Sequence, residues 1–98
     1  MPNKTVVITG GSKGIGLSIA KAFLRAHFNV YVGARNEGDL KDLNDDKLSF
    51  KKTDVRIESE VMDLIVSAAN ETGRLDVVVN NAGYSEWRPI EAIDQNLS

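Results

Sequence analysis

The stretch TVVITGGSKGIG, residues 5–16, decides the fold of this chain. Its first five residues, Thr5 to Thr9, are all β-branched. Such an unbroken run is typical of a strand that is buried on both faces of a sheet. The glycines that follow allow a sharp turn into a helix, because glycine adopts backbone angles that other residues avoid. They stand at Gly10, Gly11, Gly14 and Gly16.

Further elements follow this strand and turn at regular intervals. A helix is predicted after the glycines. Its apolar face is formed by Ile15, Ile19, Phe23 and Ala26, and Lys21 and Arg25 lie on the opposite face. Strands are predicted at residues 29–33, 48–51 and 75–79, with a short helix and a loop within 37–46. A second long helix precedes a stop at Gly73, and its apolar face comprises Ile57, Val61, Leu64, Ile65 and Ala68. A further helical segment is predicted from Ile90 onward.

Strands that alternate with helices predict right-handed βαβ units and therefore an α/β fold with a parallel sheet. Four such strands match the first half of a Rossmann-type doubly wound sheet, with the spatial strand order 3-2-1-4. The weakly alternating strand at 48–51 suits an edge of the sheet. The apolar strand at 75–79 predicts burial on both sides and therefore a further strand beside it.

Composition sets limits on the class of protein. The chain has 98 residues, a net charge of −2, 42% hydrophobic residues and 27% charged residues, which predicts one globular domain and excludes a second lobe. The near-neutral charge gives no attraction to nucleic acid or to an anionic membrane. There is no cysteine, hence no thiolate metal site, and no apolar run of signal-peptide or membrane-spanning length. We therefore expect a soluble, cytoplasmic protein with no metal site.

The glycine cluster lies where a phosphate-binding turn would be useful. The first N–H groups of a helix are unpaired and carry partial positive charge, so they attract a pyrophosphate. Ser12 could cap the helix or donate to a phosphate or ribose oxygen. The spacing G-x-x-x-G-x-G differs from the common G-x-G-x-x-G fingerprint, and Leu17 replaces the lysine of a Walker A loop. The alternative is a glycine-rich turn without a ligand, but its place between strand and helix favours dinucleotide binding.

Three motifs, each at the carboxyl end of a predicted strand, resemble signatures of the short-chain dehydrogenase/reductase family. They are the glycine loop 9–16, Asp54-Val55 and Asn80-Asn81-Ala82-Gly83, and the resemblance extends over essentially all 98 residues. It implies that residues 1–98 are the cofactor-binding half of an oxidoreductase that transfers hydride between a nicotinamide and a carbonyl or alcohol carbon. The cofactor-binding residues that it implies are Gly10, Ser12, Lys13, Gly14, Ile15, Gly16, Arg35, Asp54, Val55, Asn81, Ala82 and Gly83.

The end of the second strand bears on the choice between NAD(H) and NADP(H). NAD-binding units place an acidic residue about 20 positions after the loop, whereas NADP-binding units place an arginine nearby. Arg35 stands there and is preceded by Ala34, so NADP(H) is preferred. By resemblance, Lys13 also faces the 2′-phosphate. Two alternatives are that both cations are solvated surface charge, and that Glu37 reaches the ribose instead.

Structural roles compete with cofactor roles at the other two motifs. By resemblance, Asp54 accepts a hydrogen bond from the adenine amine; alternatively, it caps the helix that follows. By resemblance, Asn81 lines the middle of the cofactor together with Ala82 and Gly83. Asn80 and Asn81 could instead form hydrogen bonds to neighbouring strands.

The resemblance also implies a catalytic Tyr-x-x-x-Lys motif with a serine, and these 98 residues contain neither the motif nor its context. Tyr31 and Tyr84 are each followed four residues later by arginine, which cannot be tuned as lysine can. We therefore expect no catalytic residue in this chain, no turnover by it alone, and a truncation before the catalytic half. The substrate would be a small carbonyl or alcohol, and the chain would form a homo-oligomer or associate with the missing half. The alternatives are a non-catalytic nucleotide-binding or interaction module and an inactive fragment.

Overall fold

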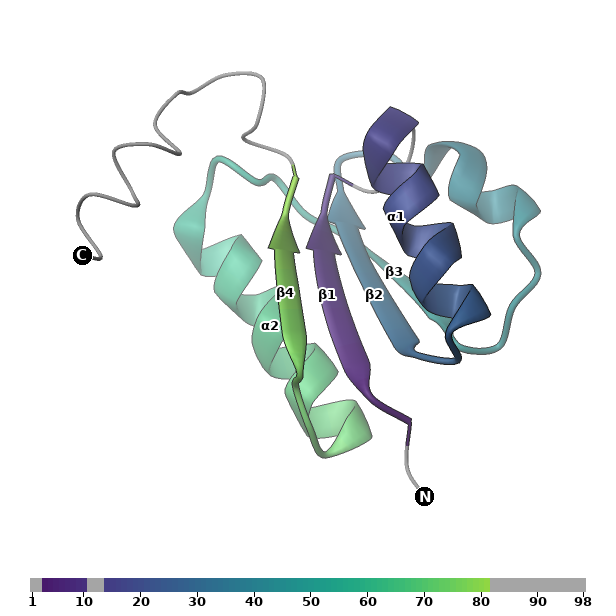
Figure 1. Ribbon diagram of the computed structural model, residues 1–98. Helices are drawn as coiled ribbons and strands as arrows, with labels where there is room; N and C mark the ends of the chain where they lie inside the picture. Colours follow the sequence, from purple (N-terminus) through teal and green to yellow (C-terminus); the bar gives the residue numbers. More distant parts are fainter. Residues whose placement is uncertain (1–2, 11–13, 82–98) are drawn as a thin grey trace, which may run out of the picture.

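Four parallel strands form one sheet in the computed structural model, which describes residues 3–10 and 14–81. The strands are β1 (Thr5–Thr9), β2 (Asn29–Ala34), β3 (Leu48–Lys52) and β4 (Val77–Asn80). Their order in the sheet is β3-β2-β1-β4 (Figure 1), which confirms the predicted order and the Rossmann-type fold. All three pairings are parallel, so every strand ends at the same edge.

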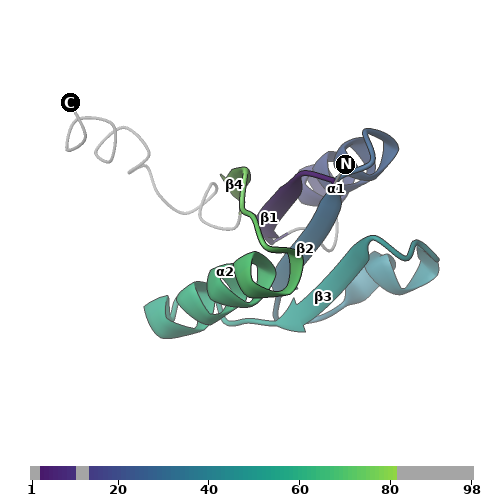
Figure 2. The ribbon, with the colours of Figure 1, turned by 90° about the horizontal axis from the view of Figure 1, so that it is seen from below.

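Two helices cover opposite faces of this sheet (Figure 2). Helix α1 (Gly14–Arg25) connects β1 to β2, and helix α2 (Glu58–Thr72) connects β3 to β4. These crossovers run in opposite directions along the sheet, so right-handed connections place their helices on opposite sides. Gly73 ends α2 with a left-handed φ of 80°, as predicted. A short 3₁₀ helix, η1 (Gly38–Asp42), precedes β3. None of these described helices is long and apolar enough to cross a membrane.

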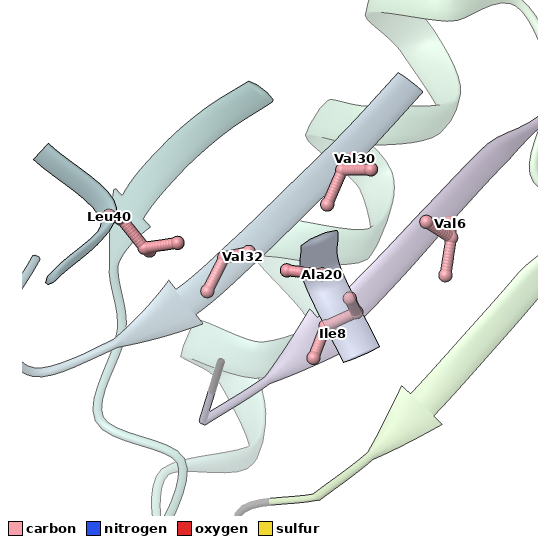
Figure 3. Packing of buried hydrophobic residues seen from close by; sticks show 6 residues of the cluster. All are labelled: Val6, Ile8, Ala20, Val30, Val32 and Leu40. Carbon is pink, nitrogen blue, oxygen red and sulfur yellow. The ribbon is translucent and has the colours of Figure 1, made fainter. Parts of the chain in front are cut away.

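The core has one layer on each face of the sheet. The layer toward α1 contains alternate residues of β1 and β2 together with one residue each from α1 and η1 (Figure 3): Val6, Ile8, Val30, Val32, Ala20 and Leu40. The layer toward α2 consists of Val7, Tyr31, Leu64 and Ala68. Both layers use the central strands, so β1 is buried along its whole length, as the β-branched run predicted.

The apolar face predicted for α1 is partly wrong. Ile15 is 69% exposed and Ala26 is also exposed, whereas Gly16 and Ala20 are the buried residues of the helix. The physical reason is that the smallest side chains lie where the helix axis comes closest to the strands, and the larger Leu17 and Phe23 pack beside them. Counting apolar residues at helical intervals does not distinguish the line of closest approach from its flanks.

The prediction for the fourth strand also needs correction. The strand runs from Val77 to Asn80 and is half-buried at alternate residues, not buried on both sides. Val77 and Val79 pack against the core layer toward α1, while Val78 is 47% exposed. The reason is that β4 pairs only with β1 among the described strands. Asp76 fixes its start, because its N–H donates to the Thr5 carbonyl (2.9 Å) and its Oδ2 accepts from the Thr5 N–H (2.7 Å).

Candidate functional site

The predicted site residues meet at the edge where all four strands end. Gly10 follows β1, Arg35 follows β2, Asp54 lies two residues beyond β3 and Asn81 follows β4. In open α/β sheets, ligands bind at this carboxyl edge. The structure thus brings together four predicted site residues that are far apart in the sequence. Ser12, Lys13, Ala82 and Gly83 are predicted site residues that lie outside the described residues.

Gly10 is held on both sides by hydrogen bonds. Its N–H donates to the Gly33 carbonyl (2.7 Å), and its carbonyl accepts from Nδ2 of Asn81 (3.0 Å). It has a φ of 75°, in the left-handed region that favours glycine. The Thr9 hydroxyl contacts Oδ1 of Asn80 at 3.0 Å. The alternative of a hydrogen bond to a neighbouring strand is therefore confirmed for Asn80, whereas Asn81 bonds to Gly10, the residue that follows β1.

The first turn of α1 leaves room for a ligand. A Cβ atom added to Gly14 would have nothing within 4 Å, and Ile15 is 69% exposed. Gly16, by contrast, is buried where the helix meets the sheet. Gly14 and the side chain of Ile15 thus face open space at the start of α1, where the unpaired N–H groups of a helix can attract a phosphate group.

A second part of the edge is a hollow between the ends of β2 and β3. Its volume is about 520 Å³, and it is lined by Arg35, Asn36, Lys52, Asp54 and Glu60. Glu37, the predicted alternative partner of a ribose, lines a separate hollow beside η1. Arg35 is therefore not accompanied by Glu37 in the hollow that follows β2. The sequence patterns did not single out Asn36, Lys52 or Glu60, because none of them belongs to a motif.

Asp54 is bound by an arginine two residues later. Its Oδ1 accepts from the backbone N–H and from Nε of Arg56 (both 3.0 Å), and its Oδ2 accepts from Nη2 (2.9 Å). These hydrogen bonds to Arg56 lower the pKa of the Asp54 carboxyl from 3.8 to about 2. A carboxylate offers about four lone-pair sites, so one site on Oδ2 is left for another hydrogen-bond donor.

The alternative role predicted for Asp54, a cap on the following helix, is wrong. Helix α2 has Ile57 at its N-cap, without a capping side chain, because the carboxylate of Asp54 is engaged by Arg56 instead. The N–H of Asp54 donates to Oε1 of Glu60 (2.7 Å), which ties the turn to the first turn of α2. Val55 lines a neighbouring hollow of about 640 Å³, together with Ile65 and Val78 among other residues.

Comparisons with known proteins agree with this geometry. A family model described as short chain dehydrogenase matches residues 4–97. A 3-oxoacyl-[acyl-carrier-protein] reductase of Chlamydia muridarum is 37% identical, over 97% of this chain and 45% of that protein. A probable 2,4-dienoyl-CoA reductase of Bacillus subtilis is 34% identical, over 98% of this chain and 40% of that protein.

Among solved structures, a variant of an actinorhodin polyketide ketoreductase with NADPH superposes with a TM-score of 0.73. It is 30% identical, over 94% of this chain and 40% of the ketoreductase. The chain thus spans less than half the length of these proteins. The match from residue 4 to residue 97 shows that this chain belongs to the short-chain dehydrogenase family.

Proposed function

We propose that residues 1–98 are the NADP(H)-binding half of the Rossmann domain of a short-chain oxidoreductase. The observation that carries this proposal is the carboxyl edge of the sheet, where Gly14 at the start of α1 and the Arg35 hollow lie at the same ends of the strands. The first turn of α1 would bind the pyrophosphate through backbone N–H groups. The hollow between β2 and β3 would take the adenosine.

The preference for NADP(H) over NAD(H) rests on Arg35. It is exposed directly after β2, and Ala34 replaces the acidic residue that would accept hydrogen bonds from the ribose hydroxyls of NAD. A guanidinium can bind a phosphate with two parallel hydrogen bonds, whereas a carboxylate at this place would repel it. The NADPH in the ketoreductase structure supports the same choice of cofactor. Lys13 remains a predicted second contact to the 2′-phosphate.

The bound cofactor would exchange hydride with a small carbonyl or alcohol substrate. The residues of this chain would hold and orient the dinucleotide, and none of them would move the substrate's proton. We assign that step to a Tyr-x-x-x-Lys motif that these 98 residues do not contain. Addition of ketones to the chain with NADPH is therefore expected to leave the nicotinamide absorbance constant.

The test is an equilibrium titration of the chain with NADPH and, separately, with NADH, in which calorimetry measures the two dissociation constants. A charge-assisted hydrogen bond contributes about 1.5–3 kcal/mol, so NADPH is expected to bind at least about tenfold more tightly than NADH. Equal affinities would overturn the NADP(H) preference. If neither NADPH nor NADH binds, the proposed nucleotide-binding function is overturned, and a non-nucleotide interaction module or an inactive fragment is favoured.

A further inference from the structure

Two neighbouring lysines near the end of β3 have different surroundings. Lys52 lines the hollow that contains Arg35, and Lys51 does not. The sheet register places the two lysines on opposite faces of the sheet, because Phe50 pairs with Val32 and Lys52 pairs with Ala34. Val32 and Phe50 belong to the core layer toward α1. Side chains alternate along a strand, so Lys52 projects on the α1 side of the sheet and Lys51 on the α2 side.

The charges that line this hollow are unevenly engaged. Asp54 forms a bidentate ion pair with Arg56, and the charge of Arg35 also helps to lower the pKa of its carboxyl; Glu60 accepts from the Asp54 N–H. Within residues 3–10 and 14–81, the ion pairs are Arg56–Asp54 and Arg74–Asp76. Neither pair involves Arg35 or Lys52. Two like charges that share a hollow repel each other, and a bound dianion would offset this repulsion.

We propose that Lys52 is a further phosphate-binding cation beside Arg35, and that the two together select a dinucleotide with a phosphate on its adenosine ribose. The proposal rests on the proposed function, since it requires that the hollow takes the adenosine of the cofactor. Arg35 would supply paired, directional hydrogen bonds, and the ammonium of Lys52 would act as a point charge at the end of a flexible chain. Both side chains lie at the ends of adjacent strands, so the phosphate would lie between β2 and β3.

The test compares Lys52→Glu with Lys51→Glu in the whole 98-residue chain. Both lysines are exposed and they are adjacent in the sequence. The two variants therefore make the same change in net charge at neighbouring positions, and they differ in the face of the sheet on which the substituted side chain lies. NADPH and NADH are titrated against each variant. We expect Lys52→Glu to raise the Kd for NADPH about tenfold and that for NADH no more than about twofold. We expect Lys51→Glu to change both constants no more than about twofold, since an exposed charge away from the site contributes little.

The other outcomes separate this proposal from the proposed function. If both lysine variants weaken NADPH binding equally, the effect comes from long-range charge alone and the proposal is overturned. If Lys52→Glu weakens the binding of NADPH and NADH equally, Lys52 contacts a chemical group that both nucleotides share, and the proposal again fails. If the unaltered chain prefers NADPH and Arg35→Asp loses that preference while Lys52→Glu keeps it, the proposed function stands and Lys52 has no role. Binding of neither nucleotide by the unaltered chain overturns both.

Discussion

Replacement of Arg35 by Asp is expected to weaken NADPH binding by at least about 1.5–3 kcal/mol, or roughly tenfold to a hundredfold. The substitution removes a cation from the hollow between β2 and β3 and places a carboxylate next to the 2′-phosphate. Binding of NADH is expected to change much less, because NADH lacks that phosphate and an acidic residue here can accept hydrogen bonds from its ribose. The readout is the ratio of the two dissociation constants, measured by calorimetry.

Lys47→Asp is a matched control for this experiment. Lys47 precedes β3 and therefore lies at the amino edge of the sheet, opposite the proposed site, while the change in charge is the same. It is expected to leave the ratio of the two constants unchanged, because charges farther apart than about 10 Å are largely screened at 0.1 M salt. Equal dissociation constants for NADPH with Arg35→Asp and with the unaltered chain would show that Arg35 does not bind the 2′-phosphate.

The second large effect concerns Gly33 and the stability of the sheet. A Cβ atom at this position in β2 would clash with Cδ2 of Leu64 and would lie 2.8 Å from Oγ1 of Thr53. Leu64 and Thr53 are both fully buried, so neither can move without disturbing its own neighbours. Gly33→Ala is therefore expected to lower the free energy of unfolding by about 1–3 kcal/mol, as measured by urea denaturation.

A double variant identifies the cause of this loss. Leu64→Ala alone is expected to cost about 2–5 kcal/mol through the cavity it leaves. When Gly33→Ala is combined with Leu64→Ala, the added methyl group has the space that the leucine side chain vacates. The combined loss is therefore expected to be smaller than the sum of the two single losses. Strictly additive losses would contradict a clash between Gly33 and Leu64 as the cause.

Most of the fold could be predicted because its signals are local and agree with one another. The β-branched run Thr5 to Thr9 is buried throughout, and Gly73 ends α2 as predicted. The strand order followed from the match of four alternating strands and helices to the first half of a doubly wound sheet, in which the fourth strand lies beside the first. The places of Arg35 and Asp54 at the carboxyl edge followed in turn, because a residue just after a parallel strand has to lie there.

The remaining details depend on contacts that sequence spacing does not encode. Lys51 and Lys52 look alike in the sequence, yet they lie on opposite faces of the sheet and only Lys52 of the two lines the hollow. The capping role predicted for Asp54 was wrong because Arg56, two residues later, forms a competing ion pair. The exposed side of α1 was misassigned at Ile15, since the contact with the sheet is centred on the small residues Gly16 and Ala20.

The central claim is that the carboxyl edge of the sheet binds a nicotinamide dinucleotide, and its most direct test is a nuclear magnetic resonance titration. The ¹⁵N-labelled chain would be titrated with NADPH while its amide chemical shifts are followed. We expect the shifts to change at Gly10, Gly14 and Arg35, at the carboxyl edge, and to stay constant at Asn29 and Leu48, where β2 and β3 begin. Changes confined to the amino edge, or no changes at all, would contradict the account.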